Sequence, residues 1–124
     1  MKFFLVGSLL YMLASSAEAS PKVVARCSGF TLPNGLALSF EYVVDPKNTG
    51  ISKPEIHSYE RDSRLSDSMV KYLGPELCDS SRTDGLKIIC VTELSETYTL
   101  DPKTKSGFET GDGYRAKYSC EFSQ

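Results

Sequence analysis

The sequence predicts an all-β domain, a small antiparallel barrel or sandwich of roughly six to seven strands, mostly in a meander, with disulfides and at most one short helix. Three observations predict it. Several segments alternate apolar and polar residues, which is the period of a strand with one buried face. Turn-forming residues recur about every eight to twelve residues. No segment has sustained helical periodicity.

Residues 1–19 have the layout of a secretory signal peptide. Lys2 gives a positive start, residues 3–14 form a mostly apolar run, and an A-x-A cleavage site follows at 17–19. The run is shorter than the roughly 20 residues that span a bilayer, although an uncleaved anchor is the alternative. We therefore expect an exported protein, periplasmic or extracellular, with a single β domain over residues 20–124 that does not span the membrane after cleavage.

Four cysteines follow the expected cleavage site, and an even number in a short exported chain favours a disulfide framework. We expect Cys27 to pair with Cys120 and Cys78 with Cys90. Cys27 and Cys120 each lie on the apolar face of an alternating stretch, so their bond would tie the first strand to the last. The chain has one histidine and no C-x-x-C pair, which argues against a zinc site.

The first two predicted strands flank a turn. Residues 23–27 alternate, and Pro33 with Asn34-Gly35 then reverses the chain. Residues 36–45 form the second strand. Its apolar face consists of Leu36, Leu38, Phe40, Tyr42 and Val44.

A turn at 45–50, rich in Asp, Pro and Gly, leads to a third strand over 51–59. Pro54 cannot donate a ladder hydrogen bond, so this strand starts late, bulges or lies at an edge. The charged, serine-rich residues 60–68 predict a surface loop.

The middle of the chain leaves one element open. Residues 69–73, Met69 to Leu73, fit either a short capped helix or a short strand. Gly74-Pro75 is expected to end that element in either case. Residues 78–85 predict a second polar loop.

The C-terminal part predicts three further features. Residues 86–94 are apolar on both faces, which favours a central strand. A tight turn near Ser95 leads to a strand over 96–100, and an Asp-Pro turn follows. The last strand, over 113–122, should close the sheet against the first and so remove exposed edges. Its apolar face consists of Tyr114, Ala116, Tyr118, Cys120 and Phe122.

The candidate chemistry is sparse. His57 is the only histidine, and a general base oriented by a carboxylate is one interpretation. A surface strand residue beside Glu55 and Tyr59 is the simpler one. Loop carboxylates could serve glycoside hydrolysis or bind calcium, but no calcium-loop pattern is present and surface solvation is simpler. They are Asp62 with Asp67, Asp79 with Asp84, and Glu109 with Asp112.

Four tyrosines on predicted strands, Tyr42, Tyr98, Tyr114 and Tyr118, suit either a binding face or an ordinary core. The net charge of −2 and the lack of a basic block give no support to a nucleic-acid partner. No nucleophile-elbow, zincin or phosphate-loop motif is present, and we expect no cofactor.

These observations favour a non-enzymatic binding or interaction module for a protein, a glycan or a small apolar ligand. One alternative is a small secreted hydrolase that uses the loop carboxylates and His57. Another is a structural, envelope-associated protein without a discrete site.

Overall fold

The computed structural model describes residues 22–44, 53–65 and 69–123. Within them the chain forms one closed antiparallel barrel of eight strands and contains no helix. The predicted all-β class is confirmed, with eight strands in place of six or seven. The expected signal peptide and the turn at 45–50 lie outside the described residues.

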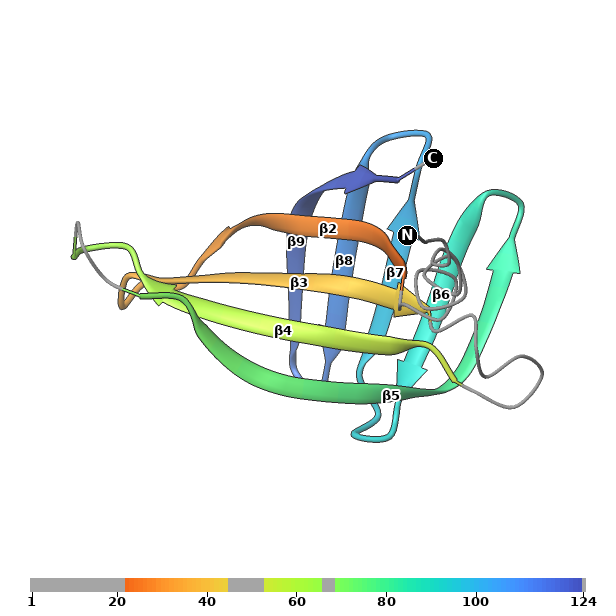
Figure 1. Cartoon of the computed structure of the whole chain (residues 1–124), viewed down its shortest axis with the longest axis horizontal. Coiled ribbons are helices and arrows are strands. Elements are labelled where there is room, and N and C mark those ends of the chain that lie inside the picture. The colour runs from red at the N-terminus through yellow and green to blue at the C-terminus, as the bar shows by residue number, and fades with distance from the viewer. Residues whose placement is uncertain (1–21, 45–52, 66–68, 124) are drawn as a thin grey trace, which may run out of the picture.

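The strands follow one another around the barrel in chain order, and the first and last strands close it (Figure 1). The topology is therefore the predicted meander. The bounds are β2 Lys22–Thr31, β3 Leu36–Val44, β4 Glu55–Asp62, β5 Lys71–Asp84, β6 Lys87–Thr92, β7 Thr97–Asp101, β8 Ser106–Gly111 and β9 Tyr114–Phe122.

Strand β5 changes partner along its length. It pairs with β4 over Lys71–Leu77 and with β6 over Cys78–Asp84. In Figure 1, β2 to β5 run along the long axis of the molecule while β7 to β9 run across it. The continuous sheet therefore bends at β5, and this bend brings the later strands over the inner face of the earlier ones.

Two predictions in the middle of the chain are wrong. Residues 78–85 are not a loop, and Gly74-Pro75 does not end an element, because β5 runs through all of them except Gly85. Within the described residues, this half of β5 pairs with β4 on one side and with no strand on the other. Pro75, which has no amide hydrogen, is therefore tolerated as it is on an edge strand. Gly74 has a φ of 99° beside a register shift, and glycine adopts that angle without strain.

The open choice for residues 69–73 is settled as strand for its last three residues, which begin β5. Strand β4 starts directly after Pro54, which is one of the outcomes the proline predicts. Strand β8 was not predicted. Strands β3, β6, β7 and β9 agree with the predicted ranges to within two residues.

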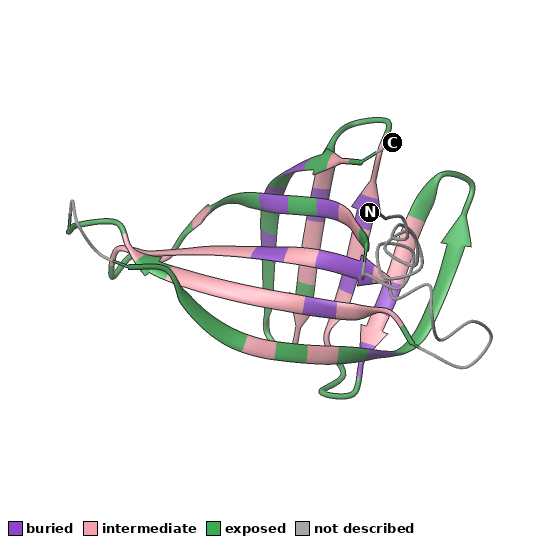
Figure 2. Ribbon diagram, in the orientation of Figure 1, coloured by how far each residue is buried: buried purple, intermediate pink, exposed green. Residues whose placement is uncertain are grey.

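The core lies where the two groups of strands overlap, and the outer ends of the strands are intermediate or exposed (Figure 2). Two disulfides join Cys27 to Cys120 and Cys78 to Cys90, which are the pairs that the sequence favours. They are compatible with an oxidising, exported location. The largest fully buried side chains, apart from the cysteines, are Tyr98, Phe40, Ile56 and Leu100.

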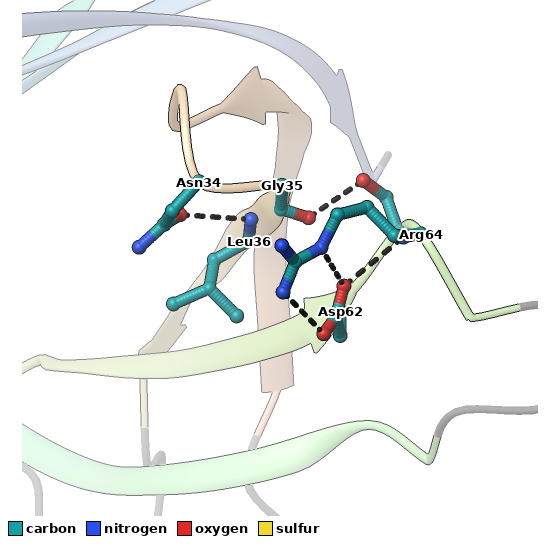
Figure 3. Close-up of polar contacts among 6 residues, drawn as sticks. Asn34, Gly35, Leu36, Asp62 and Arg64 are labelled. Atoms are coloured by element: carbon teal, nitrogen blue, oxygen red, sulfur yellow. Dashed lines mark hydrogen bonds and ion pairs between the residues drawn. The ribbon is translucent and has the colours of Figure 1, made fainter.

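Backbone and side-chain contacts hold the turn between β2 and β3 against the end of β4 (Figure 3). Ser63 donates from both its amide and its hydroxyl to the carbonyl of Gly35, at 2.8 and 2.6 Å. Arg64 forms two side-chain bonds of 3.0 Å to the Asp62 carboxylate. Asn34 accepts from the amide of Leu36 at 3.1 Å and so closes the predicted Asn-Gly turn.

We predict that Gly107→Ala lowers the free energy of unfolding. A Cβ at this position would lie 2.8 Å from Sγ of Cys120, 3.1 Å from Leu100 and 3.3 Å from Sγ of Cys27, so the barrel-closing disulfide would have to shift. Overpacking of this kind costs about 1–3 kcal/mol. Urea unfolding measures the loss, and Thr110→Ala on the exposed face of β8 is the matched control. An unchanged urea midpoint for Gly107→Ala would contradict this packing.

Candidate functional site

A pocket of about 210 Å³ lies at one end of the barrel interior. Its aromatic wall is formed by Phe40 on β3, Tyr98 on β7 and Tyr118 on β9, and the Phe40 ring contacts both tyrosine rings edge-on, with centroids 4.8 Å apart. Three carboxylates from β5, the β6–β7 turn and β8 complete the polar side. These are Glu76, Glu96 and Glu109.

Strand register explains why two of these acidic side chains point inward. Glu76 lies opposite Ile56, which is fully buried. Glu109 lies between Tyr98 and Ala116 on the neighbouring strands, and both of those are buried. Residues opposite one another in a ladder share a face of the sheet, so both glutamates face the barrel interior.

Two tyrosine hydroxyls donate hydrogen bonds to the Glu109 carboxylate. Tyr114 donates to its Oε2 at 2.6 Å and also lies 2.9 Å from Oε2 of Glu96. Tyr118 donates to Oε1 of Glu109 at 2.9 Å. Burial, together with the neighbouring carboxylates, raises the pKa of both phenols above the ordinary value. Both therefore keep their protons and act as donors.

Glu76 and Glu96 are less well satisfied. Oε1 of each carboxyl is buried and has no hydrogen-bond partner among the described residues. Burial, and then the facing carboxyl of Glu96, raise the pKa of Glu76 to about 7, whereas a hydrogen bond with the Thr92 side chain opposes that rise. The two carboxyls are close enough to share a proton, but when both are ionised neither can donate.

The pocket therefore combines three acidic groups with an aromatic wall. None of the residues that line it is a lysine, an arginine or a histidine. Among the described residues, no three His, Cys, Asp or Glu side chains are grouped so as to hold a metal ion. The arrangement suits a ligand that brings positive charge and several hydrogen-bond donors.

The structure brings some of the tyrosines and carboxylates named from the sequence into this pocket and leaves others outside. Tyr98, Tyr118 and Glu109 line it, and Tyr114 contributes its hydroxyl from an exposed position. Tyr42 is buried elsewhere and its hydroxyl bonds Ser81 at 2.8 Å.

The other carboxylates named from the sequence lie outside the pocket. Asp62 pairs with Arg64, and Asp79 lies 3.4 Å from Nζ of Lys53. Two more are exposed residues at hairpin ends, and one lies outside the described residues. These are Asp84, Asp112 and Asp67.

Sequence reasoning missed Glu76 and Glu96. Glu76 follows Gly74-Pro75, which predicts the end of an element, so the sequence pattern places Glu76 on no strand face. Glu96 was placed at the start of a strand without a partner. The spacing Glu76-x-Cys78 carried a usable signal, because a residue two before an inward cysteine on a strand shares its face.

His57 lies on the outer surface of β4 and has two side-chain partners. Its Nε2 is 2.8 Å from the Glu55 carboxylate, and its Nδ1 is 3.0 Å from the hydroxyl of Tyr72. With the ring proton on Nε2, the imidazole donates to Glu55 and accepts from Tyr72. His57 thus has a carboxylate partner, but that partner comes from its own strand and not from the loops.

No protein-family model, curated protein or solved structure matches the chain. No helix among residues 22–44, 53–65 and 69–123 is long and apolar enough to cross a membrane.

We predict that the folded state loses stability as pH rises, because Glu76 must then give up the proton that it holds in the folded state. The pKa of Glu76 is about 7 in the folded state and has its ordinary value of 4.5 in the unfolded chain, so the stability is lost between these two pH values. The groups that face Glu76 are the carboxyls of Glu96 and Glu109 and the hydroxyl of Thr92. Glu76→Gln should remove this part of the pH dependence and raise the Tm at pH 8.

Thermal unfolding followed by circular dichroism at pH 5 and pH 8 tests this, with the exposed Glu93→Gln as the matched control. If the wild-type protein and Glu76→Gln differ by the same amount in Tm at both pH values, Glu76 does not titrate in this range.

Proposed function

We propose that this protein is an exported, non-enzymatic binding module that holds a positively charged ammonium group in the pocket formed by Glu76, Glu96 and Glu109. The single observation that carries the proposal is the pair of buried carboxylate oxygens that lack a donor. Export is supported by the predicted signal peptide and by the oxidising environment that two disulfides require.

The chemistry of an ammonium group matches the pocket. It carries three donors, and Oε1 of Glu76 and Oε1 of Glu96 are acceptors in need of one. Burying a charge is costly unless it is paired and fully hydrogen-bonded, and the acidic groups supply both conditions. The faces of Phe40, Tyr98 and Tyr118 add attraction, because aromatic rings favour a nearby cation.

The apolar part of the pocket lining favours an ammonium on an aliphatic stem. Leu38 on β3 and Leu73 on β5 also line the pocket. A lysine side chain or an alkylamine would place its methylene groups against such leucines and its charged end among the carboxylates. By contrast, a small apolar ligand would leave the buried carboxylate oxygens without a donor, which is unfavourable.

We expect the oxidised protein to bind n-butylammonium at pH 8 at least tenfold more tightly than 1-butanol, which has the same stem without the charge. Glu96→Gln should weaken n-butylammonium binding at least tenfold, because it removes one charge beside the unsatisfied oxygens. Isothermal titration calorimetry measures both. Binding should weaken between pH 8 and pH 5.5, since Glu76 takes up a proton near pH 7 while the amine stays charged.

Glu93→Gln is the matched control, because it removes one exposed carboxylate outside the pocket and should leave affinity unchanged. Equal affinity for n-butylammonium and 1-butanol, or an unaltered affinity in Glu96→Gln, would contradict the proposal.

A second candidate function, hydrolysis, is favoured by the contacts of Glu55, His57 and Tyr72. A carboxylate, an imidazole and a hydroxyl in sequence are the parts of an activated nucleophile. However, Tyr72 is 48% exposed, so the nucleophile would work in bulk water without enclosed groups to stabilise the reacting oxygen.

For the binding module we expect no hydrolysis of p-nitrophenyl acetate above the buffer rate. Turnover that disappears in both His57→Ala and Tyr72→Phe, but persists in Glu96→Gln, would establish the hydrolase instead. Absorbance of released p-nitrophenol measures the rate.

A further inference from the structure

A second hollow, of about 340 Å³, lies on the outer face of the barrel and is separate in chemistry from the carboxylate pocket. Two neighbouring rows of outward side chains cross β9, β2, β3 and β4 there. Register places Glu121, Arg26, Glu41 and His57 along one row. The other row contains Ser119, Ser28, Ser39 and Tyr59.

The hollow exists because small residues lie beside large ones. The register of β2 against β3 shifts between Cys27 and Phe30, so Ser28 and Gly29 have no direct partner on β3. The short side chains of Ser28 and Ser39 line the hollow together with the longer side chains of Arg26 and Tyr59.

The hollow contains one guanidinium and two carboxylates, and the guanidinium is paired with one of them. Nε of Arg26 lies 2.8 Å from Oε2 of Glu41, and the hydroxyl of Tyr59 donates to Oε1 of the same carboxylate at 3.2 Å. Arg26 side-chain atoms are 68% exposed, and its terminal NH groups have no bond to another described residue. They remain as donors, and Glu121 and the serine hydroxyls remain as acceptors or donors.

The Tyr59 ring is fixed before any ligand arrives. Its hydroxyl is bound by Glu41, and its ring packs against Tyr72 with centroids 5.3 Å apart. Burial first, and then Glu41, raise the pKa of the Tyr59 phenol, which therefore keeps its donor proton. A ring held in one orientation costs little entropy when a flat ligand packs on it.

We propose that this hollow binds a neutral saccharide. A sugar carries many hydroxyls, each both donor and acceptor, and these match the mixed serine, carboxylate and guanidinium lining. Its C–H face packs on the negative face of an aromatic ring such as Tyr59. An anionic ligand would find Arg26 already paired with Glu41 and a second carboxylate, Glu121, in the lining, and an apolar ligand would leave polar groups unpaired.

The size of the hollow agrees with this class of ligand. About 340 Å³ lies at the small end of the range of small-molecule sites. The site is shallow and open along the two rows, so an oligosaccharide can lie across the strands with one ring over Tyr59. The hollow shares Ser39, Phe40 and Tyr59 with the carboxylate pocket. Glu76, Glu96 and Glu109 do not line the hollow, so saccharide binding there does not rest on the proposed ammonium site.

The test is a nuclear magnetic resonance titration of the ¹⁵N-labelled, oxidised protein with maltotriose, cellotriose and tri-N-acetylchitotriose. We expect at least one of them to give saturable shifts centred on the amides of Arg26, Ser28 and Tyr59. Arg26→Ala and Tyr59→Ala should each weaken that binding at least tenfold. Tyr59 also borders the carboxylate pocket, whereas Arg26 does not, so Arg26→Ala is the more specific variant.

Phe108→Ala is the matched aromatic control, because Phe108 lies on the outer face of β8 beneath Arg115 and away from the hollow. Glu96→Gln should bind the saccharide as the wild-type protein does, even if it no longer binds n-butylammonium. The proposal is overturned if none of the three saccharides gives saturable shifts, or if Arg26→Ala and Phe108→Ala bind equally well. A peptide that occupies these residues when no saccharide does would also overturn it.

Discussion

Closure of the barrel is the constraint on which the rest of the structure depends. Strands β2 and β9 pair over only four residues each, Ala25–Ser28 and Ser119–Phe122. The Cys27–Cys120 disulfide lies within this short ladder, and it closes a loop that includes nearly the whole domain. In the chain-entropy view such a long loop restricts the unfolded chain by roughly 4–5 kcal/mol. A short closing ladder is therefore sufficient, and the aromatic residues of β3, β7 and β9 can meet inside.

The strands that could be predicted from the sequence are those with one face buried and the other exposed to solvent. The alternation of β3 and β9 and the turn residues at Asn34-Gly35 and Ser95 are local signals, and they located most strands. The second half of β5 gave no such signal, because Cys78 is its only buried residue and the chain there is polar on both faces. Strand β8 could not be predicted for a related reason. Its buried residue is Gly107, which has no apolar side chain to reveal the alternation of a strand.

The carboxylate pocket could be predicted only in part. Tyrosines are conspicuous, and their strands were known, so Tyr98 and Tyr118 could be named as possible binding residues. The inward face of Glu76 could be inferred from its spacing to Cys78, but its contact with Glu96 could not, because the bend at β5 places these two acidic side chains, distant in sequence, against each other. Similarly, Ile89 and Val91 suggested a covered strand face. In the structure Cys90 points inward, and Ile89 and Val91 on either side of it point to the outside of the barrel, where they are half-buried.

The ends of the described chain lie beside each other. Ser123 donates from its amide to the carbonyl of Val24 at 2.9 Å and from its hydroxyl to the carbonyl of Val23 at 2.8 Å. A short linker between these ends would therefore span little distance, and the chain could be reopened at the exposed tip near Gly85 or Gly113. A circularly permuted barrel of this kind would keep both disulfides and every strand neighbour. The order of strands around the barrel, more than the point at which the polypeptide starts, defines this architecture.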